Sequence, residues 1–173
     1  HDCKIQVVNI FLICTQLYSV CSLHLYNNHQ ALATPTTKRS SSPEDNLKTM
    51  IHLRNAQSSL TFASSSLLPT IELQTAKKNG AQVRIISDND KAADQGSDID
   101  KLAEAGIPTC VDNSPFHMHN KFAIIDKKIL INGSFNWTRS ASASNNENVI
   151  AYILYKNVGQ VLLNIFAIVF NMR

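Results

Sequence analysis

The chain has 173 residues, of which 44% are hydrophobic and 17% are charged, and its formal net charge is +3. This length supports one domain with a core of its own and is too short for two full domains. The slight positive charge permits a phosphate-bearing partner without requiring one. The four cysteines include no C-x-x-C pair, so no disulfide framework is expected.

The N-terminal segment is poor in charge. No Asp, Glu, Lys or Arg occurs from Ile5 to Thr37, and the stretch Val7–Tyr26 is mostly apolar and about as long as a bilayer span. Polar residues inside this stretch weaken a membrane assignment, so a buried strand followed by a helix is the alternative. Ala33–Pro43 has the composition of a linker. We therefore predict an N-terminal apolar segment with a linker over residues 1–42 and a folded domain over residues 43–173.

Helical spacing, turn residues and short apolar runs predict alternating helices and strands in the rest of the chain. The predicted helices are Pro43–Arg54, Leu68–Asn79, Ile99–Ala105 and a very apolar Val158–Phe170. The predicted strands are Ser59–Ser65, Ala81–Ser87, Ile107–Val111, Phe122–Asp126 and Asn146–Leu154. This alternation favours an α/β fold with a largely parallel sheet.

The side chains that could take part in a reaction are concentrated in HMHNKFAIIDKKILINGSFNWT, from His117 to Thr138. His119 and Lys121 are two positions apart, and on a strand they would point to the same side. Ser134 and Asn136 alternate in the same way after the run KKILING. If the two runs pair as a hairpin, both pairs of side chains line one pocket.

Such a pocket suits a phosphodiester. Lys121, Ser134 and Asn136 can donate to phosphate oxygens and stabilise charge in a pentacovalent transition state. His119 can be a nucleophile that forms a phosphohistidine, or a general base, and it needs a carboxylate to hold its ring. His117 is expected at the rim, as a solvated side chain more than as a substrate contact. No acidic cluster suited to Mg²⁺ is recognised, so a metal-free mechanism is favoured.

The pattern H-x-K-x4-D-x6-G-S-x-N, read from His119 to Asn136, resembles the signature of the phospholipase D superfamily. The resemblance covers roughly Pro43 to Leu154. It looks closest to the single-motif branch, which contains the mitochondrial cardiolipin hydrolases (Zucchini-type endonucleases) and small bacterial endonucleases. It implies an α/β domain with a mixed, largely parallel sheet flanked by helices and with one motif per chain.

The resemblance also implies a role for each matching residue. His119 corresponds to the family's nucleophile. Lys121, Ser134 and Asn136 correspond to its phosphate-binding residues.

Two carboxylates complete the implied site. Glu147 lies where these relatives keep a glutamate that orients the histidine. Asp126 belongs to the signature and is grouped with the catalytic residues, although its expected role is to hold loop or strand geometry.

The family builds each active site from two such motifs, and only one H-x-K occurs here. The resemblance therefore implies a homodimer with the active site on the two-fold axis. It implies no cofactor. Zucchini-type members carry a zinc site, but the spacing of Cys14, Cys21 and His24 does not match it, so no metal is expected.

Three functions are weighed. The first is a phospholipase D-type phosphodiesterase that hydrolyses cardiolipin or a phosphatidylcholine-like phospholipid to phosphatidate. The alternative is a metal-independent endonuclease that cuts single-stranded RNA or DNA. The third, a catalytically silent scaffold or lipid-binding module, is disfavoured by the complete signature. A groove of basic residues near the motif would favour nucleic acid, and its candidates are Lys77, Lys78, Arg84, Lys127, Lys128 and Arg139.

The apolar N-terminal segment and the resemblance together suggest the mitochondrial outer membrane, with the domain facing the cytosol. A cytoplasmic or otherwise membrane-associated location is the alternative.

Overall fold

The computed structural model describes residues 38–40, 43–64, 69–92, 97–112 and 115–153. The apolar segment Val7–Tyr26, the Cys14, Cys21 and His24 group and the last predicted helix lie outside the described residues. Within the described residues no helix is long and apolar enough to cross a membrane.

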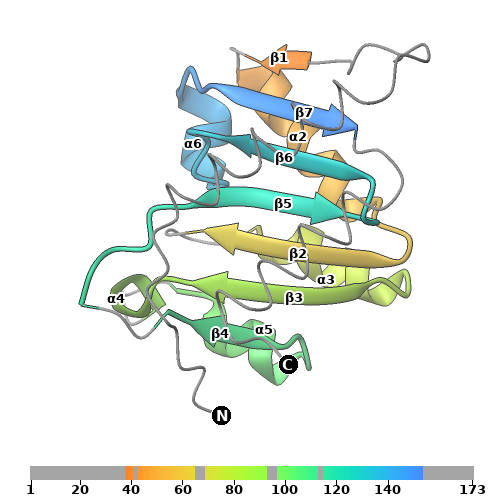
Figure 1. Ribbon diagram of the computed structural model, residues 1–173, viewed down its shortest axis with the longest axis vertical. Helices are drawn as coiled ribbons and strands as arrows, with labels where there is room; N and C mark the ends of the chain where they lie inside the picture. The colour runs from red at the N-terminus through yellow and green to blue at the C-terminus, as the bar shows by residue number, and fades with distance from the viewer. Residues whose placement is uncertain (1–37, 41–42, 65–68, 93–96, 113–114, 154–173) are drawn as a thin grey trace, which may run out of the picture.

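Within the described part of the chain, seven strands form one mixed sheet in the order β1-β7-β6-β5-β2-β3-β4 (Figure 1). The strands are β1 (Lys38–Ser40), β2 (Ser59–Ser64), β3 (Gln82–Ser87), β4 (Thr109–Val111), β5 (Lys121–Ile125), β6 (Ile129–Gly133) and β7 (Val149–Ile153). The helices are α2 (Pro43–Arg54), α3 (Thr70–Lys78), α4 (Asn89–Ala92), α5 (Ile99–Glu104) and α6 (Arg139–Ser144).

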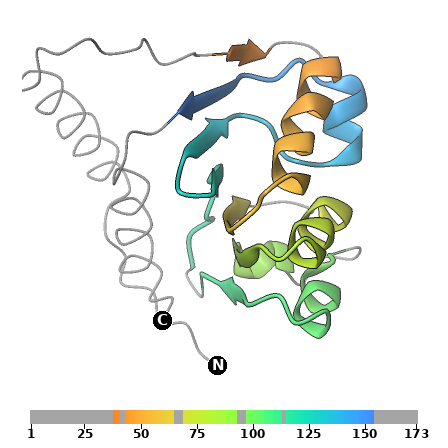
Figure 2. The ribbon, with the colours of Figure 1, turned by 90° about the vertical axis from the view of Figure 1, so that its right-hand side faces the viewer.

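The main core lies between the sheet and the helices α2, α3 and α6, which cover one of its faces (Figure 2). Leu53 of α2 and Leu73 of α3 are fully buried there against the alternating strand residues Leu60 and Phe62. Burying each side chain of this size stabilises the fold by about 1.5–3 kcal/mol. The period-two pattern of β2 therefore has a structural cause, since one of its faces must meet the helical layer.

The predicted fold class, α/β with a mixed sheet flanked by helices, is confirmed, but the share of parallel pairing is smaller than expected. Only β2–β3 and β3–β4 pair parallel, while β2–β5, β5–β6, β6–β7 and β1–β7 pair antiparallel. The turn at residues 126–128 joins β5 to β6 directly, and so short a connection can only join antiparallel neighbours.

Most predicted helices and strands are present, with ends shifted by a few residues. The elements that were not predicted are short. Lys38–Ser40, predicted as linker, pairs antiparallel with β7 as an edge strand. The helices α4 and α6 were not predicted, because the sequence RSASAS of α6 has no apolar periodicity. Its start is set by Thr138, whose hydroxyl accepts the Ala141 N–H at 2.9 Å. Cys110 on β4 is disulfide-bonded, contrary to the expectation for the cysteines, and its partner lies outside the described residues.

Asp126 holds the start of β2 from the far end of β5. Its carboxylate accepts the backbone N–H groups of Gln57, Ser58 and Ser59 at 2.6–3.1 Å. Its own N–H donates to the Ser59 carbonyl at 2.8 Å, and its φ of 52° is left-handed. Burial raises the pKa of Asp126, but these hydrogen bonds together outweigh burial and hold the pKa below its ordinary value.

Replacing Asp126 by Asn is expected to lower the free energy of unfolding by about 1–2 kcal/mol at pH 7. Asn tolerates the left-handed backbone, so the loss isolates the charged hydrogen bonds. Because folding lowers the Asp126 pKa, its contribution is complete above the unfolded value of about 3.9 and is lost as pH falls through the folded value. Urea unfolding followed by circular dichroism should show the deficit at pH 7 and a shrinking deficit below about pH 4.

The matched control is Glu104→Gln, an exposed carboxylate of α5. It is expected to change stability little at either pH. A deficit for Asp126→Asn that stays constant across this pH range would contradict the assigned role of the charge.

Candidate active site

Most of the predicted site residues lie in or next to loops that meet at one end of the sheet, and Asp126 is the exception. Ser64, the last residue of β2, pairs with both Ser87, the last of β3, and Lys121, the first of β5. The end of β6 pairs with the start of β7 at this same end of the sheet, on the left in Figure 1. The carboxyl ends of parallel strands are where open α/β sheets commonly bind ligands.

A pocket of about 450 Å³ lies at this end. It brings together the predicted residues His119 and Asn136. His117 also lines it, as expected for a residue at its rim. The full lining is Lys91, His117, His119, Asn136, Thr138, Ser140, Ala141 and Asn145.

His119 lies two positions before Lys121, the first residue of β5, and is therefore not on the strand. Its side chain is exposed at the pocket. Among the described residues its imidazole makes no hydrogen bond, and its carbonyl accepts one from Lys121 Nζ at 3.4 Å. The ring is therefore accessible to a ligand, as a nucleophile must be.

Lys121 is an unusually buried cation, with 5% of its surface exposed. Burial lowers the pKa of Lys121, and the nearby charge of Glu147 partly offsets this effect. In so dry an environment an ammonium interacts more strongly with a phosphate than it would in water. Lys121 is not among the residues that line the pocket, and its phosphate-binding role stays a prediction.

Ser134 and Glu147 belong to one hydrogen-bond network. Ser134 Oγ donates to Glu147 Oε2 at 2.5 Å and accepts the Asn148 N–H at 2.9 Å. Asn145 Nδ2 donates to Glu147 Oε1 at 2.9 Å. Among the described residues Glu147 makes no hydrogen bond to His119, so its predicted orienting contact is not made within one chain.

Gly133 is required by the close approach of β6 to residue 148. A Cβ atom at Gly133 would lie 1.8 Å from the Asn148 carbonyl oxygen, far inside contact distance. The Ser134 N–H donates to that same oxygen at 2.8 Å. The Gly-Ser pair of the motif therefore has a physical cause, because the missing side chain lets Ser134 reach the segment that carries Glu147.

Alternation after Gly133 separates pocket from core. Phe135 and Trp137 are buried, whereas Ser134 is exposed and Asn136 is partly exposed at the pocket. Trp137 packs edge-on against Phe62 with ring centroids 5.1 Å apart. Because the rings of Phe135 and Trp137 anchor the loop in the core, Asn136 between them is held at the surface of the site.

Asp126 was grouped with the catalytic residues, and the structure corrects this placement. It lies at the opposite end of β5 from Lys121, bound to residues 57–59. Within the chain its role is the structural one described above.

Most of the basic residues considered for a groove do not lie near the motif. Lys127 and Lys128 form the β5–β6 turn beside Asp126, and Lys77 and Lys78 end the helix that leads into the start of β3. These four lysines therefore lie toward the end of the sheet remote from the pocket. Of the other two candidates, Arg84 donates to Thr61 Oγ1 at 3.3 Å within the sheet.

The last candidate, Arg139, does lie near the pocket. It begins α6 between the lining residues Thr138 and Ser140.

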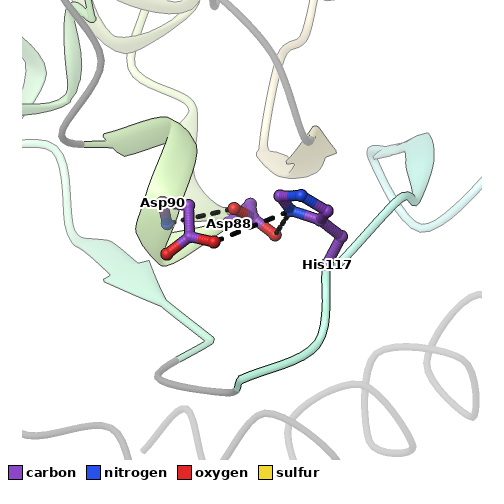
Figure 3. Close-up of side chains that lie close together, drawn as sticks. All are labelled: Asp88, Asp90 and His117. Carbon is purple, nitrogen blue, oxygen red and sulfur yellow. Dashed lines mark hydrogen bonds and ion pairs between the residues drawn. The ribbon is translucent and has the colours of Figure 1, made fainter.

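A carboxylate that the sequence analysis missed, Asp88, lies next to the pocket-lining residue His117 (Figure 3). Asp88 follows β3 and has 1% of its surface exposed. Its Oδ2 is 3.3 Å from His117 Nδ1 and accepts the Met118 N–H at 2.7 Å. These partners are 29 and 30 positions away in the sequence, so no local pattern indicated the contact.

Asp88, Asp90 and His117 could offer three ligand atoms within 4.8 Å of one another. Both Asp88 oxygens, however, already accept hydrogen bonds, Oδ1 from the N–H groups of Asp90 and Lys91 and Oδ2 from Met118. These hydrogen bonds explain why the Asp88 carboxylate is held in this position, and no metal ion is needed to explain it.

Comparisons with known proteins identify the family to which the chain is related. Residues 50–167 match the family described as cardiolipin synthase, PLD-like domain. The mitochondrial cardiolipin hydrolase of Chlamydomonas reinhardtii is 64% identical over 70 residues, which cover 40% of this chain and 31% of that protein. The protein of the same name from Danio rerio is 35% identical over 135 residues, which cover 76% of this chain and 60% of that protein. The chain thus spans less than two thirds of the length of these relatives.

Among solved structures, the phospholipase D family member Nuc from Salmonella typhimurium superimposes with a TM-score of 0.68 at 26% identity. The superposition covers 79% of this chain and 95% of that chain.

Replacing Gly133 by Ala is expected to lower both stability and activity, because the new Cβ must push residue 148 away and strain the link between Ser134 and Glu147. Overpacking of this kind costs about 1–3 kcal/mol. In an assay of the phosphodiesterase activity proposed below, the rate of hydrolysis of bis(para-nitrophenyl) phosphate should fall by about tenfold or more, since tenfold corresponds to about 1.4 kcal/mol.

Gly80→Ala provides the contrast, since Gly80 has a φ of 95° and no atom within 4 Å of an added Cβ. It is expected to cost about 1–2 kcal/mol of stability and leave the rate unchanged. Equal losses of activity in the two variants would mean that the contact at Gly133 has no special bearing on the site.

Proposed function

The chain belongs to the phospholipase D-like family, and from this premise we propose that it is a phosphodiesterase that hydrolyses a cardiolipin-type phospholipid to phosphatidate. The observation that carries the proposal is an exposed His119 that lines the pocket together with Asn136 and lies two positions before the buried cation Lys121. The cardiolipin hydrolases among its relatives support the choice of substrate.

In the proposed reaction His119 attacks the phosphorus atom and the bond to the leaving alcohol breaks, which gives a phosphohistidine. Lys121 and Asn136 donate to the non-bridging oxygens, whose charge grows in the transition state. Water then attacks the phosphorus, releases phosphatidate and regenerates the imidazole. The steps need a proton donor for the leaving alkoxide and an acceptor for the proton of the water.

We propose that a second copy of the chain supplies this proton donor and acceptor. One His119 cannot attack phosphorus and protonate the leaving group in the same step. A homodimer with both His119 rings at a site on its two-fold axis meets the requirement with a single gene product. The exposure of His119 at an open pocket is compatible with such an arrangement.

Lipid is preferred to nucleic acid as the substrate because of where the cations lie. Four of the lysines and arginines considered for a groove are remote from the pocket, and Lys91 is the lysine in its lining. Binding of a long polyanion relies on many phosphate contacts, whereas one scissile phosphodiester needs few. Cleavage of single-stranded RNA or DNA is the alternative, supported by the shared phosphodiester chemistry.

The mitochondrial relatives support a mitochondrial location, and we propose the outer membrane with the domain facing the cytosol.

A substrate panel tests the activity. Wild-type protein in EDTA is expected to hydrolyse cardiolipin vesicles faster than labelled single-stranded RNA or DNA. His119→Asn should lower turnover by about a thousandfold or more, as removal of a nucleophile does elsewhere. His52→Asn is the matched control, because His52 is exposed on α2 and does not line the pocket. Normal turnover by His119→Asn would refute the nucleophile, and exclusive cleavage of nucleic acid would refute the lipid substrate.

A mixing experiment tests the shared site. Wild-type and His119→Asn chains are unfolded, mixed and refolded together in different ratios. If both His119 rings serve one site, activity falls as the square of the wild-type fraction, so an equal mixture retains about one quarter of it. A linear fall, with about one half retained, would mean that each chain works alone.

A further inference from the structure

His117 lines the pocket but has no role in the proposed reaction. It lines the pocket together with His119, and its side chain is 62% exposed. Its ring nevertheless has a defined partner, since Nδ1 lies 3.3 Å from Oδ2 of the buried Asp88 (Figure 3). An exposed histidine with a buried, fixed carboxylate behind it is oriented, unlike a merely solvated one.

Asp88 is a rigid acceptor. The N–H groups of Asp90 and Lys91 donate to its Oδ1 at 3.0 and 3.1 Å, and the Met118 N–H donates to its Oδ2 at 2.7 Å. Burial raises the pKa of Asp88, but these hydrogen bonds and His117 outweigh burial and hold the pKa below its ordinary value. The carboxylate is therefore ionised at neutral pH.

The ionised carboxylate determines which nitrogen of His117 carries the proton. An ionised carboxylate can only accept hydrogen bonds, so Nδ1 of His117 must donate to it. In the neutral imidazole the lone pair then lies on Nε2. Because the ring lines the pocket, Nε2 is the nitrogen left for a ligand, and it is an acceptor.

The charges around the ring argue against a second phosphate as this ligand. Asp90 Oδ2 lies 4.0 Å from Nδ1 of His117, on the same ring atom that meets Asp88. These two carboxylates offset the charges that Lys91 and a protonated His117 would bring to this part of the pocket. A neutral hydroxyl, which donates to Nε2 without adding negative charge, suits the position better.

We propose that His117, positioned by Asp88, contacts the substrate by accepting a hydrogen bond from a free hydroxyl of the alcohol esterified to the reacting phosphate. This inference rests on the proposed lipid function, where the hydroxyl is that of the central glycerol of cardiolipin. The Cα atoms of residues 117 and 119 are at most about 7 Å apart. A hydroxyl one carbon from the phosphoester can therefore meet His117 while His119 meets the phosphorus.

The test compares cardiolipin with a propanediol-linked analogue that lacks only the hydroxyl of the central glycerol, both in the same detergent micelles. Wild-type kcat/KM is expected to be about tenfold higher for cardiolipin, the value of one hydrogen bond. His117→Ala should lose the preference and hydrolyse cardiolipin and the analogue with about equal kcat/KM. Asp88→Asn should reduce the preference, and it should have no further effect on the preference when combined with His117→Ala. His52→Ala, on α2, is the control and should keep the wild-type preference for cardiolipin.

The proposal is overturned if wild type hydrolyses both lipids equally well, or if His117→Ala keeps the preference. The wild-type comparison needs no variant, so misfolding of a variant cannot mask the result. Failure of wild type to hydrolyse either lipid would instead refute the proposed function on which this inference rests. A preference for RNA over DNA of the same sequence, with no preference between the lipids, would overturn the assignment to the glycerol hydroxyl.

Discussion

The register of the antiparallel strands β5, β6 and β7 is the constraint on which the site depends. Phe122 pairs with Asn132, and Gly133 pairs with Val149, so the loops that carry His119, Ser134 and Glu147 leave the sheet at one end. A slip of one residue would turn each strand's buried side chains outward. Gly133 protects this register because only a residue without Cβ fits against the Asn148 carbonyl. The geometry of the pocket is thus a consequence of backbone pairing.

Buried polar groups at the same end of the sheet hold the functional side chains in place. Lys121, Glu147 and Asp88 are each at least nine-tenths buried, and each is close to opposite charge or to hydrogen-bond donors. Unpaired, such groups would be destabilising, so their partners are part of the fold. His117 and His119, by contrast, are exposed and line the pocket.

The sequence analysis succeeded where a property repeats over neighbouring residues. Helix α2 and strands β2, β3 and β5 follow from apolar spacing, and the hairpin of β5 and β6 follows from two apolar runs around a short turn. It failed for the edge strand β1, whose residues Lys38–Ser40 are polar and pair only because β7 presents a free edge. It left open whether the basic residues share one face, and the structure places Lys127, which is close to the motif in sequence, toward the other end of the strands.

The sequence by itself determined the family pattern, the α/β alternation and the identity of the pocket residues His119 and Asn136, because each depends on spacings within a few residues. Only the tertiary structure decided which carboxylate forms hydrogen bonds with which residues. Asp126, inside the motif, binds the backbone at the far end of β5, whereas Asp88, outside it, holds His117 from 29 positions away. The physical reason is that hydrogen-bond partners are chosen by distance in space, and strand pairing brings distant residues together while it separates near ones.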